Sequence, residues 1–105
     1  MGAMDELVAR AERRLEQMRE LGEATARVRA RETSPDGAVT VEVDGNGALL
    51  DLSLSAAISR LTPTEFDRVV VDTARRAAAA AFARRGELIT AFNREAESGP
   101  GTGRT

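Results

Sequence analysis

Residues 34–54 read SPDGAVTVEVDGNGALLDLSL, and this stretch decides the fold of the chain. Apolar and polar residues alternate in two runs, residues 39–44 and 50–54, with the period of two that is typical of half-buried strands. Ser34-Pro35-Asp36-Gly37 ahead of the first run suits a type I turn, and Asp44-Gly45-Asn46-Gly47 between the runs suits a hairpin. The stretch therefore predicts an antiparallel strand pair with one apolar face.

The segment upstream adds a strand and a helix. Residues 27–33 alternate in the same way, so we expect an antiparallel three-stranded meander. From residue 4 to about residue 27 the apolar residues step by three and four, which predicts an amphipathic helix roughly 35 Å long. Its apolar positions are Met4, Leu7, Val8, Ala11, Leu15, Met18 and Leu21.

A second long helix is predicted downstream. Thr62-Pro63-Thr64-Glu65 has the pattern of a capping box, and the alanine-rich sequence after it favours a helix to about Glu97. This helix has two apolar stripes. One contains Phe66, Val69, Val70, Thr73, Ala77, Ala80 and Ala81, and the other contains Val71, Ala78, Phe82 and Ile89. The surplus stripe is covered either by a second subunit or by the first helix, and we expect a homodimer.

Length and composition limit the function. The 105 residues suffice for one domain, which we place at residues 1–97, with a disordered Gly/Pro/Ser-rich tail at 98–105. The sequence has no cysteine and no histidine, so no catalytic residues, no cofactor and no metal site are predicted. It also has no apolar run long enough for a membrane span or a signal peptide, so we expect a cytoplasmic, non-enzymatic protein without membrane contact.

Charge is unevenly distributed along a chain whose formal net charge is −2. Residues 32–67 carry one arginine against seven acids, whereas residues 68–94 carry six arginines against two acids. All fifteen basic residues are arginine, which fits either the codon usage of a GC-rich genome or the recognition of phosphate. With three phenylalanines and no other aromatic residue, the chain is poorly equipped to stack on single-stranded bases.

The chain resembles the YbaB/EbfC family of nucleoid-associated proteins, in particular its actinobacterial branch. The resemblance lies in the order and spacing of the stretch quoted above and of the later segment LTPTEFDRVVVDTARRAAAAAF. The resemblance covers about residues 4–93. It implies an α+β subunit of helix, three-stranded sheet and helix, which dimerises and binds double-stranded DNA in the nucleoid with projecting helices. The family has no invariant catalytic or ligand residue to carry over.

DNA contact would therefore depend on surface arginines that meet phosphates with little base specificity. The candidates on the two helices are Arg10, Arg13, Arg14, Arg75, Arg76, Arg85 and Arg94. Arg84 falls on the apolar stripe, and its role stays open. An alternative partner is another protein, because similar chains are associated with type VII secretion systems. Such a partner would use the apolar stripe or the acidic middle of the chain.

Overall fold

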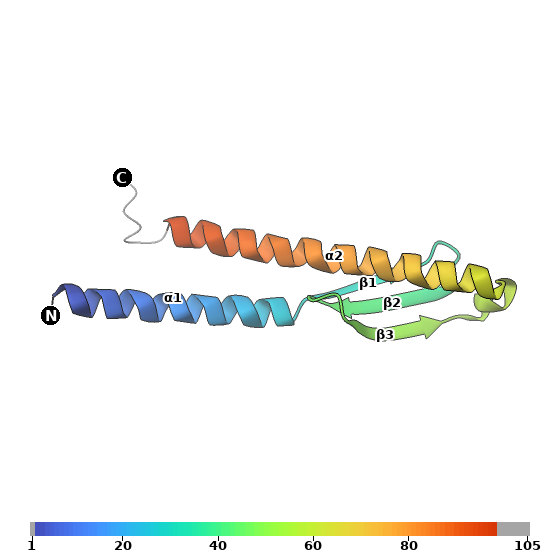
Figure 1. Ribbon diagram of the computed structural model, residues 1–105, viewed down its shortest axis with the longest axis horizontal. Helices are drawn as coiled ribbons and strands as arrows, with labels where there is room; N and C mark the ends of the chain where they lie inside the picture. The colour runs from blue at the N-terminus through green and yellow to red at the C-terminus, as the bar shows by residue number, and fades with distance from the viewer. Residues whose placement is uncertain (1, 99–105) are drawn as a thin grey trace.

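The computed structural model describes residues 2–98 and confirms the predicted α+β architecture (Figure 1). Helix α1 (Ala3–Ala26) is followed by strands β1 (Arg29–Thr33), β2 (Val39–Asp44) and β3 (Leu49–Leu54). A short 3-10 helix, η1 (Ala56–Arg60), which the sequence did not predict, leads into helix α2 (Pro63–Ser98). The predicted tail lies outside the described residues from residue 99 onward.

The three strands form the predicted antiparallel meander in the order β1-β2-β3. Ala30 pairs with Val43 and Val41 pairs with Leu52, so the apolar side chains share one face. A register shift between Glu42 and Val43 places Leu49 on that face as well. The opposite face carries the polar side chains of β1 and β2 except Glu32, which pairs with Val41 on the apolar face.

Both predicted turns form, and each is fixed by an aspartate. In the first, the Asp36 carboxylate accepts hydrogen bonds from the Ser34 hydroxyl (2.6 Å) and the Ala38 amide (3.0 Å). In the second, the Asp44 carboxylate accepts from the amides of Asn46 (2.8 Å) and Ala48 (3.0 Å). Gly47 there has a φ of 82°, a conformation that favours glycine.

Helix α2 starts at the predicted capping box. The Thr62 amide donates to Glu65 Oε1 (2.9 Å), and the Glu65 amide donates to Thr62 Oγ1 (3.1 Å). The first half of α2 lies across β1 and β2 (Figure 1). Among the described residues, the buried apolar side chains are all alanine or valine, namely Val28, Ala30, Ala38, Val39, Val41, Val43, Ala77 and Ala81, and Thr73 of α2 is buried with them.

Strand β3 is left uncovered. Leu49, Leu52 and Leu54 are 60%, 41% and 46% exposed, although they lie on the apolar face of the sheet. The second stripe of α2 is open beside them, with Val71 48% and Phe82 49% exposed. Helix α1 does not cover either surface, so the sheet end of the subunit has a large unpartnered apolar patch.

The second half of α2 runs antiparallel to α1, and together they form a two-helix arm that projects from the sheet (Figure 1). The β2–β3 turn packs where the arm meets the sheet. There the buried Gly45 lies against the Thr25 carbonyl of α1, and Gly47 lies against the Phe82 ring of α2. A Cβ at Gly45 would lie 2.5 Å from this backbone oxygen, so the turn packs tightly against the end of α1.

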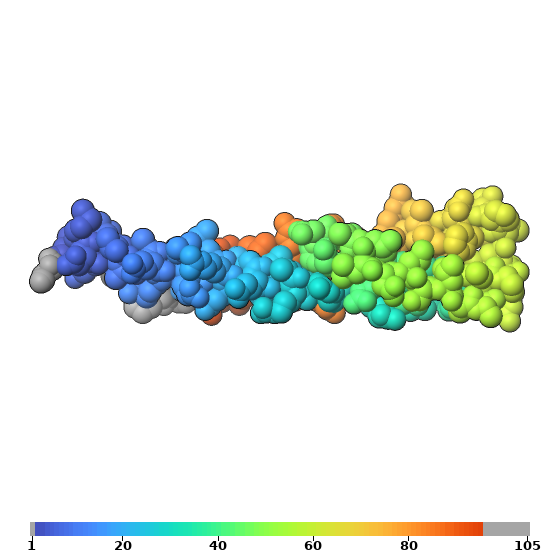
Figure 2. Space-filling model, turned by 90° about the horizontal axis from the view of Figure 1, so that it is seen from below, coloured from blue at the N-terminus to red at the C-terminus, as the bar shows by residue number. Residues whose placement is uncertain are grey.

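The subunit is strongly elongated, measuring 72 × 24 × 16 Å (Figure 2). Its radius of gyration is 20.9 Å, against about 13 Å for a compact chain of this size. The accessible surface is 7388 Å², whereas a compact monomer of this mass exposes about 5,700 Å². The excess of surface reflects the elongated shape and the uncovered apolar faces of the subunit.

Candidate nucleic-acid interface

Four of the predicted arginines gather toward the free end of the arm. The Arg14 guanidinium lies over the Phe92 ring, 5.0 Å from the ring centroid, which fixes the relative positions of the two helices. Arg10 and Arg13 lie within about one helical turn of Arg14, and Arg94 is two residues beyond Phe92. All four are exposed. We call these four residues, Arg10, Arg13, Arg14 and Arg94, the arm cluster.

Within residues 2–98, Arg10 and Arg13 make no hydrogen bond or ion pair with another described residue. Arg14 makes only a long hydrogen bond to Gln17 (3.4 Å) besides its contact with Phe92. Their guanidinium groups are therefore available to a phosphate, which a guanidinium can bind through two parallel hydrogen bonds.

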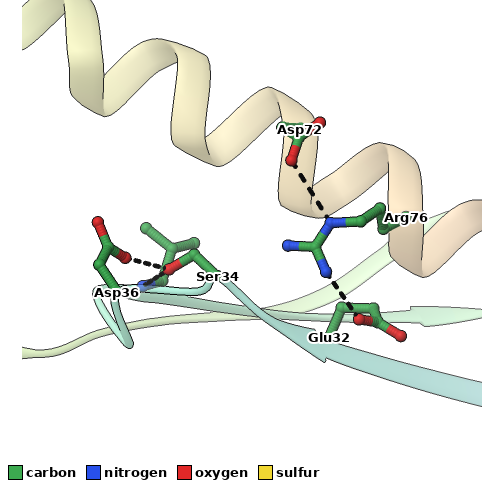
Figure 3. A network of polar contacts seen from close by, with 6 residues as sticks. Glu32, Ser34, Asp36, Asp72 and Arg76 are labelled. Atoms are coloured by element: carbon green, nitrogen blue, oxygen red, sulfur yellow. Dashed lines mark hydrogen bonds and ion pairs between the residues drawn. The ribbon is translucent and has the colours of Figure 1, made fainter.

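Arg76 is placed differently. Its Nη1 lies 3.0 Å from Glu32 Oε1 on β1, and its Nε lies 3.4 Å from Asp72 Oδ2 one turn back on α2 (Figure 3). The guanidinium is half-buried, and its Nη2 is buried without a partner among the described residues. Arg76 therefore connects α2 to the sheet edge, and its charge is already balanced by two carboxylates.

Arg75 and Arg85 point in different directions from α2. Arg75 is exposed. Arg68 lies on the same helix face seven residues earlier, and it was not among the arginines predicted from the sequence. Arg85 is half-buried and lines a surface hollow of about 400 Å³ with Phe82, Gly86 and Ile89. It thus belongs to the second apolar stripe.

The predicted arginines therefore do not share one edge. Nine residues separate Arg85 from Arg94, which at 100° per residue puts them on opposite sides of α2. Arg84, whose role was left open, donates from Nη1 to the backbone carbonyl of Arg29 and so joins α2 to the start of β1.

The sheet end is acidic. Hydrogen bonds hold the pKa of two carboxyls there below the ordinary value. For Asp36 the main cause is the Ser34 hydroxyl, and for Asp44 it is the Ala48 amide, followed by that of Asn46. Both carboxylates therefore stay charged at neutral pH. A polyanion approaching these carboxylates would be repelled, whereas Arg10 and Arg13 on α1 have no carboxylate partner among the described residues.

Within residues 2–98 no group of three potential metal-ligating side chains comes together, and no helix has the length and apolar character needed to cross a bilayer. The described residues form a small α+β protein with charged helices and exposed apolar faces, and exposed apolar faces of this kind are typical of interaction surfaces.

Comparison with known proteins identifies the family. The family model of the YbaB/EbfC DNA-binding family matches residues 1–95, so the chain belongs to this family of nucleoid-associated DNA-binding proteins. The fold is similar to the crystal structure of the uncharacterized protein HP0035 from Helicobacter pylori, with a TM-score of 0.66 and 19% sequence identity. That match covers 90% of this chain and 98% of the other. A search of curated proteins found no match.

Proposed function

We propose that this protein is a cytoplasmic nucleoid-associated protein of the actinobacterial branch of its family, which binds double-stranded DNA as a homodimer through arginine–phosphate contacts with little base specificity. The observation that carries the proposal is the arm cluster, whose three exposed arginines on α1, Arg10, Arg13 and Arg14, lie toward the free end of the arm, where Arg14 contacts Phe92 of α2. Membership of a DNA-binding family supports DNA as the partner.

The arm cluster suits phosphates better than bases. Its side chains project from exposed helix surfaces, and no aromatic side chain among the described residues is free to stack there, because Phe92 is half-buried under Arg14. Arginines that meet only phosphates hold the duplex without reading its sequence. Arg75 and Arg68 add basic side chains farther along α2, about 28 Å from Arg94 to Arg75 at 1.5 Å per residue, on a face about 100° around the helix from Arg94.

We assign the remaining predicted arginines other roles. Arg76 is held by Glu32 and Asp72, and Arg85 lies in the apolar stripe. The homodimer would form through the open patch at the sheet end, where burial of Leu49, Leu52 and Leu54 with Val71 would complete the core.

The proposal is tested by duplex DNA binding of paired variants in a mobility-shift titration. Arg10→Ala with Arg13→Ala should weaken binding to all sequences alike, and should reduce the salt dependence by about two phosphate contacts per subunit. Arg31→Ala with Arg60→Ala is the matched control, since it also removes two exposed arginines but from the sheet end of the subunit. Equal loss of affinity in the two variants would contradict the assignment.

A further inference from the structure

A hollow of about 200 Å³ opens between the first half of α2 and the turn that joins β1 to β2. Val71 of the second apolar stripe is turned about 160° around the helix from Val69, which lines the hollow. The hollow is therefore separate from the surface that we assign to the homodimer, and also from the arm cluster at the other end of α2. Its lining residues are Ser34, Pro35, Arg68, Val69, Asp72 and Thr73.

The walls of this hollow are mostly apolar. Pro35 and Val69 contribute carbon, and the hydroxyl of Ser34 is already in use, since it donates to Asp36 Oδ1 (2.6 Å) and accepts from the Val39 amide (3.1 Å). An engineered cavity of about 150 Å³ holds a benzene ring. The hollow thus has room for an apolar group of the size of an aromatic ring.

Thr73 brings a hydrogen-bonding group to the hollow that the fold does not use. The residue is fully buried, and its Oγ1 has no hydrogen-bond partner among residues 2–98. A buried hydroxyl without a partner is destabilising. Threonine in a helix has two favoured side-chain rotamers, so rotation about the Cα–Cβ bond can turn the hydroxyl toward the hollow. An acceptor delivered there would stabilise the protein.

A second unpaired donor lies on the same side of α2. Arg76 follows Thr73 by one helical turn, and its Nε lies 3.4 Å from Oδ2 of Asp72, which lines the hollow. Its Nη1 is held by Glu32, whereas its Nη2 is buried without a partner in the described part of the chain. Figure 3 shows this second terminal nitrogen on the side of Arg76 that faces Ser34. Arg76 Nη2 therefore lies at the edge of the hollow.

Arg68 supplies an unbalanced positive charge at the mouth of the hollow. It is exposed, and it makes no hydrogen bond or ion pair with any residue from 2 to 98. Asp72, the acid in the lining, is engaged by Arg76. The unpaired groups of Thr73, Arg76 and Arg68 can all donate hydrogen bonds, so a ligand has to supply acceptors. A carboxylate supplies two, with a charge and geometry that match a guanidinium.

We propose that this hollow binds a small organic carboxylate whose apolar part is about as large as an aromatic ring. The carboxylate pairs with Arg68 and accepts a hydrogen bond from Thr73, with Arg76 Nη2 as a further donor. The apolar part lies against Pro35 and Val69. A purely apolar molecule would leave the donors unpaired, and an inorganic anion would leave the apolar walls uncovered. The inference uses neither the arm cluster nor the homodimer, so it does not rest on the proposed function.

Titration with sodium benzoate, followed by amide NMR at constant ionic strength and without DNA, tests the inference. The amide signals of Ser34, Val69 and Thr73 should shift, with a dissociation constant of about 1 mM or tighter, which ligands of this size can reach. Benzamide has the same shape without the charge, and sulfate has the charge without the ring. Both should bind at least about tenfold more weakly than benzoate. An absence of shifts, or equal binding of benzamide or sulfate, would overturn the inference.

Two variants test the donors. Thr73→Val keeps the shape of the side chain and should weaken benzoate binding about tenfold, while the melting temperature stays the same or rises because an unpaired buried hydroxyl is removed. Arg68→Gln, at an exposed position, should weaken it about tenfold or more without touching the core.

The matched controls make the same changes on α2 outside the hollow. Thr90→Val and Arg75→Gln both alter exposed residues, and Arg75 is two turns from Arg68 on the same face. Each control should stay within twofold of the wild type. Benzoate binding within twofold of the wild type in Thr73→Val or in Arg68→Gln would contradict the site. A crystal grown with benzoate that showed only ordered water beside Thr73 and Arg76 would do the same.

Discussion

Substitution of Gly45 by alanine tests how the arm is fixed to the sheet. An alanine Cβ would lie 2.5 Å from the Thr25 carbonyl oxygen and 3.2 Å from Val28 Cβ. Because carbon and oxygen approach to about 3.3 Å without repulsion, the turn or the end of α1 would have to move by about 0.8 Å. Overpacking of this kind costs about 1–3 kcal/mol of unfolding free energy. For a chain of this size that lowers the melting temperature by roughly 5–15 °C.

The assay is thermal unfolding followed by circular dichroism, with Gly22→Ala as the control. A Cβ at Gly22 meets nothing within 4 Å, and the residue lies inside α1, so alanine there should raise stability by about 0.5–1 kcal/mol. If Gly45→Ala lowers the melting temperature and Gly22→Ala raises it, the destabilisation comes from the contact at Gly45 and not from the glycine-to-alanine change itself. If Gly45→Ala melted at or above the wild-type temperature, the tight packing of this turn against α1 would be refuted.

Three further perturbations have defined outcomes. Thr62→Ala should lower the unfolding free energy by about 1 kcal/mol, since the Glu65 amide loses its acceptor, and an unchanged denaturant midpoint would contradict this. Arg76→Ala should cost about 1 kcal/mol, because two half-exposed ion pairs are lost, and double-mutant cycles with Glu32→Gln should show coupling. Because folding lowers the pKa of Asp36 and Asp44, the two carboxylates stabilise the fold fully at pH values above their ordinary pKa of 3.8. This stabilisation decreases as the pH falls through the pKa values of the folded state. Acid unfolding should therefore steepen below about pH 4 and become shallower in Asp36→Asn with Asp44→Asn, whereas an identical acid profile would show that the two turns contribute nothing.

Short-range patterns in the sequence were sufficient to predict the fold. Alternation in residues 39–44, the two aspartate turns and the reciprocal capping bonds of Thr62 and Glu65 are short-range features, and each forms where the sequence predicts it. The η1 helix was missed because five residues of Ala56–Arg60 give too short a periodic pattern to detect.

The candidate interface was harder to predict, because it depends on how two helices are oriented. Helical spacing alone placed Arg76 and Arg85 with the other arginines, but the partner of Arg76 on β1 is 44 residues away in sequence. The position of Arg85 in the second apolar stripe was visible from its three-residue step after Phe82.

The most direct test of the account is the dissociation constant of the wild-type protein for duplex DNA of unrelated sequences, measured at 50 and 200 mM salt. If arginines of the arm cluster meet phosphates, two contacts alone should weaken binding about tenfold between these concentrations, and four contacts about a hundredfold. The loss should be the same for every duplex, since phosphates carry no sequence information. An absence of binding at 50 mM salt, or an affinity that does not change with salt, would contradict a DNA-binding role through the arm cluster.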